Sequence, residues 1–158
     1  MPLIFRLPGP VRQGGICRQP VGIVDLAPTL LGFAGMPLPW EMHGQDLRPL
    51  LLRPDFATDR PLLTEHFGIR LGLETDRGET GTDGLRGVPW WLSLRQGRYK
   101  YVRELVPEKI EELYDLERVP DELKNIALDP ASLSILEEYR ARLHAELKRT
   151  KAGLLHAL

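Results

Sequence analysis

The sequence predicts an α+β fold, in which a strand and a helix precede an antiparallel hairpin and a long terminal helix. Three observations carry this prediction. Residues 90–101 alternate apolar and polar side chains around a glycine, which is typical of a half-buried hairpin. Residues 129–147 place leucines along one stripe behind Asp129-Pro130, which is typical of a helix with an N-cap. The apolar run Leu3–Leu7 is typical of a strand buried on both faces.

The first third of the chain is expected to hold the strand Met1–Leu7 and then a helix. Asp25 is a plausible N-cap for this helix, Pro28 suits its first turn, and Gly35 stops it. The apolar face of the helix is expected to consist of Leu26, Leu30, Leu31 and Ala34. A short leucine-rich turn, Leu47–Leu52, follows.

The second part begins with an expected strand, Pro61–Phe67. Residues 68–88 contain six glycines and form a loop that is long for a compact domain, so we expect it to be either functional or mobile. A short strand is expected at Leu113–Leu116. The terminal helix is expected to end before Gly153 and to bury a stripe made of Leu133, Leu136, Leu143 and Leu147.

The hairpin is the clearest local pattern. A two-residue turn at Gln96-Gly97 would pair Leu94 with Tyr99 and Leu92 with Tyr101. Its apolar face would then carry Trp90, Leu92, Leu94, Tyr99 and Tyr101. Its polar face would carry Ser93, Arg95, Arg98 and Lys100.

Length and composition exclude several classes of protein. The 158 residues suit one ordinary domain or a piece of a larger one. The 21 Lys and Arg against 22 Asp and Glu exclude the basic excess on which non-specific nucleic-acid binding relies. The single cysteine excludes a disulfide framework or a CxxC site within this chain. No run approaches the roughly 18–20 apolar residues that span a bilayer, and MPLIFRLPGP does not match a signal peptide.

Charge is balanced overall but not locally. Residues 86–103 carry five basic side chains and no acid, whereas residues 104–124 carry eight acids and three bases. We expect the two segments to be neighbours that neutralise one another. The alternative is that the basic face of the hairpin meets an anionic ligand.

The residues alone do not assemble a complete site. Cys17 has no nearby histidine to activate it and is interpreted as a small buried or incidental residue. The four histidines, which form no metal-binding pair, are His43, His66, His144 and His156. His66 lies where an expected strand meets the long loop, and such positions often carry functional side chains.

Three segments in order resemble one family, the sulfatases of the alkaline-phosphatase superfamily. The first is PLIFRLPG at 2–9 with QPVGIVDLAPTLL at 19–31, which looks like the family's strand, PG loop and helix. The second is GQDLRPLL at 44–51, which is similar to G-x-S-L-x-P-L-L with Asp46 in place of serine. The third consists of LRQGRYKY at 94–101, ELYDL at 112–116 and PDELKNIA at 120–127.

This resemblance implies a division of the chain into two parts. Residues 1–57 would be the truncated end of the sulfatase α/β catalytic domain, holding its last strand and helix. Residues 58–158 would be the C-terminal subdomain, a small antiparallel sheet with a terminal helix. The chain would therefore begin inside a domain, and we expect a C-terminal fragment of a sulfatase.

The resemblance also implies a chemistry that this chain does not carry. Intact sulfatases hydrolyse sulfate esters with a divalent metal, usually calcium, and a formylglycine made from C/S-x-P-x-R. Cys17 does not match that motif, because Gln19 and Val21 stand where proline and arginine are required. No aspartate matches the paired metal-binding aspartates. We therefore expect no catalytic residue, no metal ligand and no bound cofactor in this chain, and no activity from the chain alone.

The resemblance further implies that the C-terminal subdomain helps to shape the substrate cleft. His66 and Trp91 are the candidates for that role, whereas Trp90 is assigned to the core. The expected partners are a sulfated small molecule or glycan and the missing N-terminal catalytic part, with no nucleic acid and no membrane. Localisation depends on that missing part and is open between the cytoplasm and the periplasm or exterior.

Two alternatives stay open. One is a hydrolase of the same superfamily that acts on phosphodiesters or phosphonate esters. The other is a non-catalytic module that presents Arg95, Arg98 and Lys100 to sulfated glycans.

Overall fold

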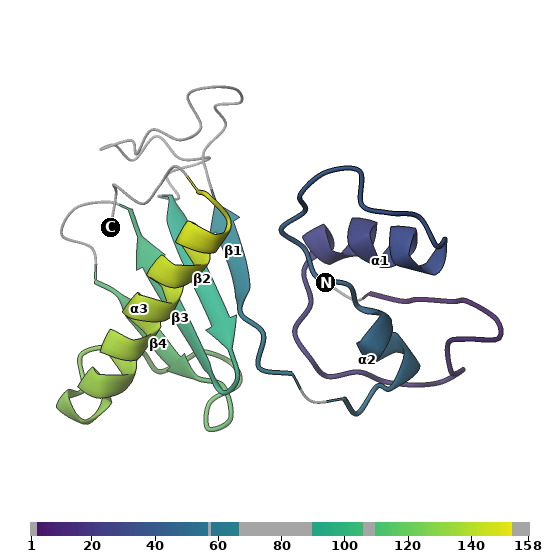
Figure 1. Cartoon of the computed structure of the whole chain (residues 1–158). Helices are drawn as coiled ribbons and strands as arrows, with labels where there is room; N and C mark the ends of the chain where they lie inside the picture. Colours follow the sequence, from purple (N-terminus) through teal and green to yellow (C-terminus); the bar gives the residue numbers. More distant parts are fainter. Residues whose placement is uncertain (1–2, 57, 67–89, 106–109, 153–158) are drawn as a thin grey trace. The chain divides into compact units, whose positions relative to one another are not determined.

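The structure is a computed structural model that describes residues 3–56, 58–66, 90–105 and 110–152. The chain divides into two compact units, Met1–Asp59 and Arg60–Leu158 (Figure 1). This division lies close to the expected boundary between residues 57 and 58, while the assignment of the two parts to family domains stays a prediction. The expected loop 68–88 and Gly153 lie outside the described residues.

The first unit is built from short helical elements. They are the 3-10 turn η1 (Ile23–Asp25), helix α1 (Leu26–Phe33) and helix α2 (Arg48–Leu52). The expected helix is confirmed as α1, and the expected leucine-rich turn Leu47–Leu52 contains the short helix α2. No strand lies among residues 3–56, so the first unit is held together by helices and loops.

Asp25 is fully buried and joins two segments that are far apart in sequence. Its carboxylate accepts hydrogen bonds from the Gly22 amide at 2.7 Å and from the Gln45 amide at 2.7 Å. The Thr29 hydroxyl donates to the Asp25 carbonyl at 2.6 Å and accepts from the Leu47 amide at 2.8 Å. Asp25 precedes α1 as predicted, but its side chain binds the 45–47 segment instead of capping α1.

Asp46, which stands where the resembled motif has serine, binds the first residue of α2. Its carboxylate accepts from the Arg48 amide at 2.9 Å and from Arg48 Nε at 2.7 Å. Arg48 Nη1 in turn donates to the Gly32 carbonyl near the end of α1 at 2.7 Å. Because the last carbonyls of a helix lack partners within it, this guanidinium links the two helices.

Two predictions about the first unit are wrong. Leu3–Leu7 forms no strand, and Leu3 and Ile4 are 41% and 88% exposed. A strand requires a neighbouring strand for its backbone hydrogen bonds, and the described part of the first unit has none. The buried side of α1 carries Pro28 and Thr29, whereas Leu30 is exposed.

The second unit is a sheet with a helix on one face. Strands β1 (Leu62–His66), β2 (Trp91–Gln96), β3 (Tyr99–Glu104) and β4 (Glu112–Asp115) form an antiparallel sheet in the order β1-β2-β3-β4. The turn η3 (Pro130–Ser132) leads into α3 (Leu133–Arg149), which lies across the sheet (Figure 1). The predicted α+β class, strands and terminal helix are confirmed.

The register of the hairpin differs from the prediction by two residues. Leu94 faces Tyr101 and Gln96 faces Tyr99, so the turn consists of Gly97 and Arg98. Gly97 has a φ of +54°, which suits the first position of a type II′ turn and favours glycine there. A shift by two keeps the side chains of β2 and β3 on their predicted faces, because strand side chains alternate with a period of two. Arg98 is the exception, since it moves from the predicted polar face into the turn.

The core lies between the sheet and α3. It consists of Leu92, Leu94, Tyr101, Leu113, Ala127, Leu136, Tyr139, Leu143 and Leu147. Three of the four leucines predicted for the helix stripe are buried, but Leu133 is 52% exposed because it is the first residue of α3. Trp90 is buried, as predicted. None of the described helices is both long enough and apolar enough to cross a membrane.

Candidate functional site

The basic and acidic segments of the second unit pair with each other, which confirms the expected neutralisation. Arg98 bonds Asp115, Lys100 bonds Glu122 at 2.6 Å, and Arg103 bonds Glu111. These three pairs engage Arg98 and Lys100, which the glycan-binding alternative needs as free cations. The structure therefore argues against the whole basic face as a ligand site.

Glu111 also fixes α3 to the sheet. Its carboxylate accepts from the Tyr101 hydroxyl at 2.7 Å and from Arg140 Nε of α3 at 2.9 Å, in addition to Arg103. Burial raises the pKa of Glu111, but the hydrogen bonds from Arg140, Tyr101 and Arg103 outweigh it and hold that pKa below its usual value. The acid therefore stays charged and keeps all three donors bound.

Asp115, at the end of β4, binds Arg98 in the turn between β2 and β3. Arg98 Nε donates to its Oδ1 at 2.7 Å, and the Glu117 and Arg118 amides donate to the same oxygen at 3.2 and 3.3 Å. The Arg98 guanidinium lowers the pKa of Asp115 from 3.8 to about 2. A carboxyl with a lowered folded-state pKa stabilises the protein above its unfolded pKa and loses that effect as pH falls toward the folded value.

Replacing Arg98 with glutamine is expected to raise the pKa of Asp115 toward 3.8 and to lower the stability of the fold at pH 7. The wild-type chain loses stability between about pH 4 and pH 2 as the Asp115 carboxylate becomes protonated. This loss of stability should be smaller in the variant. NMR titration of the Asp115 carboxyl and urea unfolding at the two pH values measure both effects. The control Lys124→Gln removes the charge of an exposed side chain that takes no part in the hydrogen bonds of Asp115, and it should leave the Asp115 titration almost unchanged. Equal shifts in both variants would contradict the assignment.

The structure brings together the two cleft candidates that the sequence singled out. His66 on β1 and Trp91 on β2 are directly paired across the strands. Their rings stack with centroids 5.6 Å apart and planes inclined by 19°. Both lie at the same end of the sheet, where β1 ends and β2 begins. Their role at a substrate cleft stays a prediction.

The same face of the sheet carries Ser93 and Arg95. Trp91, Ser93 and Arg95 alternate with Leu92 and Leu94, which face α3, so the three point away from the helix. Ser93 is 4% exposed, although it lies on the side opposite α3. Arg95 Nε is buried and has no hydrogen-bond partner in the described part of the chain.

The catalytic groups expected of the resembled family do not assemble in this part of the protein. Across residues 3–56, 58–66, 90–105 and 110–152, no three His, Cys, Asp or Glu side chains converge as a metal site. Cys17 is a free thiol and is exposed, so of the two interpretations, a small buried residue or an incidental one, the buried one is wrong. Among the residues that the structure describes, no set of side chains fits a divalent metal centre.

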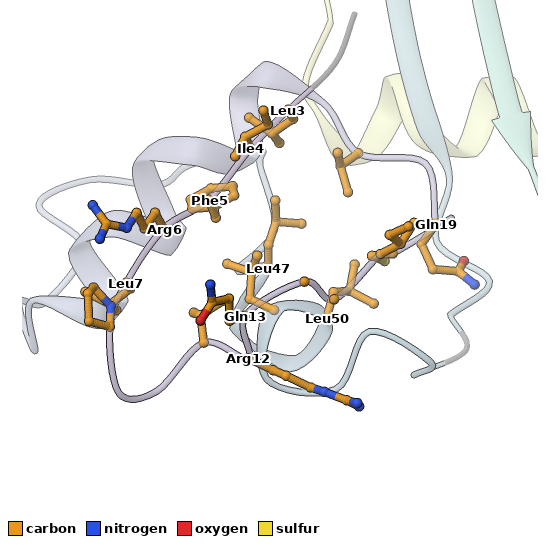
Figure 2. A pocket seen from close by; sticks show the side chains of 18 residues that line it. Leu3, Ile4, Phe5, Arg6, Leu7, Arg12, Gln13, Gln19, Leu47 and Leu50 are labelled. Carbon is orange, nitrogen blue, oxygen red and sulfur yellow. The ribbon is translucent and has the colours of Figure 1, made fainter.

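The first unit has a large groove beside its N-terminal segment (Figure 2). Its volume is about 760 Å³, and its lining combines residues 3–8 and 11–17 with side chains such as Leu47 and Leu50. Leu47 and Leu50 are buried, whereas Leu3 and Ile4 are largely exposed. The groove is thus lined by the apolar segment Leu3–Leu7, which the sequence predicted to be a buried strand.

Sequence reasoning missed the placement of Arg95 and Ser93 in one row with Trp91. The alternation within 91–95 indicated a shared face, but nothing in the sequence showed which hairpin cations find an acid. It also missed the bond from Gln45 to Asp25, because the two residues are 20 positions apart. Pairings of that kind depend on the folded path of the chain.

Comparison with known proteins gives consistent similarities. A family model described as "N-sulphoglucosamine sulphohydrolase, C-terminal" matches residues 1–68. A Delta 4,5-hexuronate-2-O-sulfatase of Bacteroides thetaiotaomicron is 32% identical over 155 residues, which cover 96% of this chain and 29% of that protein. The chain thus spans less than a third of the length of this relative.

Solved structures show the same similarity. A putative sulfatase from Bacteroides thetaiotaomicron has a TM-score of 0.61 and 31% identity, covering 81% of this chain and 25% of the other. A phosphonate monoester hydrolase of Agrobacterium radiobacter has a TM-score of 0.57 and 25% identity, covering 79% of this chain and 24% of the other. In each case the similarity covers most of this chain but only about a quarter of the larger protein.

Proposed function

Because the chain belongs to the sulfatase family and corresponds to the C-terminal portion of its members, we propose that the polypeptide containing it hydrolyses sulfate esters. The observation that carries this proposal is the 32% identity over 155 residues to a hexuronate-2-O-sulfatase. That relative acts on a sulfated sugar by its name, which supports a sulfated glycan or sugar as the substrate class.

The proposal divides the work between this chain and the rest of the polypeptide. A formylglycine nucleophile and a divalent cation, calcium by family resemblance, are supplied outside these 158 residues. This chain supplies a structural support and, through His66 and Trp91, part of the wall of the substrate cleft. The stacked pair favours that role, because an aromatic surface beside a strand end suits a sugar ring.

A phosphonate monoester as substrate is the second candidate. The similarity to the hydrolase of Agrobacterium radiobacter favours it. Sulfate monoesters and phosphonate monoesters each carry one negative charge, which is shared by oxygens around a tetrahedral sulfur or phosphorus atom. The same protein side chains can therefore bind either ester. The two candidate functions differ in the central atom of the substrate, sulfur or phosphorus. A direct comparison of turnover with the two substrates distinguishes them.

The proposal is tested by assaying the 158-residue chain beside the longest polypeptide that contains it. We expect the longer polypeptide to release 4-nitrophenol from 4-nitrophenyl sulfate, because it would hold the nucleophile and the metal ligands. We expect no turnover above the uncatalysed rate from the 158-residue chain, because the nucleophile would lie outside it and its described residues hold no cluster of metal ligands. Turnover by the short chain, or none by the long one, would overturn the proposal.

A further inference from the structure

The apolar N-terminal segment beside the groove has the exposure pattern of a strand, although it forms none. Ile4 is 88% exposed, whereas Leu3 and Leu7 are 41% and 37% exposed. Phe5 is half-buried. Because the side chains of an extended segment alternate between its two faces, Leu3, Phe5 and Leu7 share the face that packs on the first unit. Ile4 and Arg6 share the outward face, and Figure 2 shows the Arg6 guanidinium pointing away from the groove.

The backbone of this segment leaves most of its hydrogen-bonding groups unpaired. Among the residues that the structure describes, the amides and carbonyls of residues 3–6 form no hydrogen bond, and the Leu7 carbonyl accepts one from the Val11 amide at 3.2 Å. Pro8 and Gly9, which has a φ of +96°, then turn the chain. A segment with one packed face and open backbone groups is an unprotected strand edge, which favours pairing with a further strand.

We propose that two copies of this chain associate through antiparallel pairing of residues 3–7 with residues 3–7 of the second copy. A twofold axis at Phe5 places Leu3 opposite Leu7 of the second copy, and Ile4 opposite Arg6 of the second copy. Paired strands lie about 4.8 Å apart, so the inward side chains of the second copy enter the groove beside the segment. This association is independent of the proposed hydrolysis of sulfate esters.

The sequence of the segment favours a second copy and the antiparallel direction. Antiparallel pairing sets apolar side chains opposite apolar ones, Leu3 opposite Leu7 and Phe5 opposite the same residue of the second copy. It also places each Arg6 opposite the uncharged Ile4. Parallel pairing in register would instead place the two Arg6 guanidinium groups directly opposite each other, and like charges in that position are destabilising. The segment is therefore complementary to a reversed copy of itself.

The test is the mass of the 158-residue chain in solution, measured by sedimentation velocity over a series of concentrations. We expect the mass to approach twice the 17.9 kDa of one chain in the high micromolar range and to return to one chain on dilution. A single chain at every concentration would overturn the inference. Aggregates of undefined size, without a dimer, would also overturn it, because they would indicate association without a defined register.

Charge variants at Ile4 test the direction of pairing, and the exposed position of this side chain keeps the packing of the first unit intact. Ile4→Lys sets a lysine opposite Arg6 at two places in the dimer and should weaken the association at least about tenfold. Ile4→Glu sets an acid there and should keep the affinity within about twofold of the wild type. The control Leu128→Lys, at a 75% exposed position of the second unit, should have no effect. Equal weakening by Ile4→Lys and Ile4→Glu would contradict the antiparallel arrangement.

Engineered cysteines test the register directly, in a Cys17→Ser background that removes the exposed native thiol. A mixture of chains carrying Ile4→Cys and Arg6→Cys should form a disulfide-linked dimer on air oxidation, because Cβ atoms of directly opposite residues lie about 4.5–5.5 Å apart. Chains with Ile4→Cys alone should cross-link at least about fivefold less, since their cysteines lie diagonally across the strands at about 7–8 Å. Equal cross-linking of the mixture and of Ile4→Cys alone would overturn the proposed register.

Discussion

Replacing Gly44 with alanine is expected to unfold the first unit. A Cβ atom at this position would lie 1.9 Å from the carbonyl oxygen of Val24, which is far inside van der Waals contact. The neighbouring Gln45 amide must stay close enough to bond Asp25, so the segment cannot move away without breaking that hydrogen bond. We expect a loss of about 3 kcal/mol or more in the free energy of unfolding.

Hydrogen exchange of the Gln45 and Leu47 amides measures this effect locally, because both donate to the Asp25–Thr29 pair. In the variant these two amides should lose their protection. The control Gln45→Ala changes an exposed side chain and keeps the amide, so protection should persist. Unchanged protection in Gly44→Ala would show that the close contact with Val24 is wrong.

Replacing Leu143 with alanine is expected to destabilise the second unit by about 2–5 kcal/mol. Leu143 is 1% exposed and lies in the core between α3 and the sheet, so its removal leaves a cavity. Urea unfolding followed by far-ultraviolet circular dichroism measures the change.

Leu133 provides the matched control for Leu143. Both are leucines of α3, but Leu133 is 52% exposed, so Leu133→Ala should change the stability by no more than about 0.5 kcal/mol. The sequence pattern treats the two leucines alike, whereas the structure separates them. Similar losses in the two variants would contradict the packing of α3.

Elements defined by local patterns were predictable from the sequence. The hairpin faces were predicted correctly, because alternation survives even the two-residue error in register. That error arose at the turn, since glycine can occupy either central position and only the folded backbone shows that Gly97 is the first.

Elements that depend on distant partners were not predictable. Leu3–Leu7 has the composition of a buried strand, but a strand forms only beside another, and the described part of the first unit provides none. The stack of His66 on Trp91 required the alignment of two strands separated by residues 67–90. The sequence indicated both residues individually, and only the register brings them into contact.

The central proposal is that the polypeptide containing this chain hydrolyses sulfate esters. The most direct test is the ratio of kcat/KM for 4-nitrophenyl sulfate to that for 4-nitrophenyl phenylphosphonate, measured on the longest polypeptide that contains the chain. The leaving group is the same in both substrates, so the ratio reports the preference for the central atom. We predict a ratio above one; a ratio below one, or no turnover of the sulfate ester, would contradict the account.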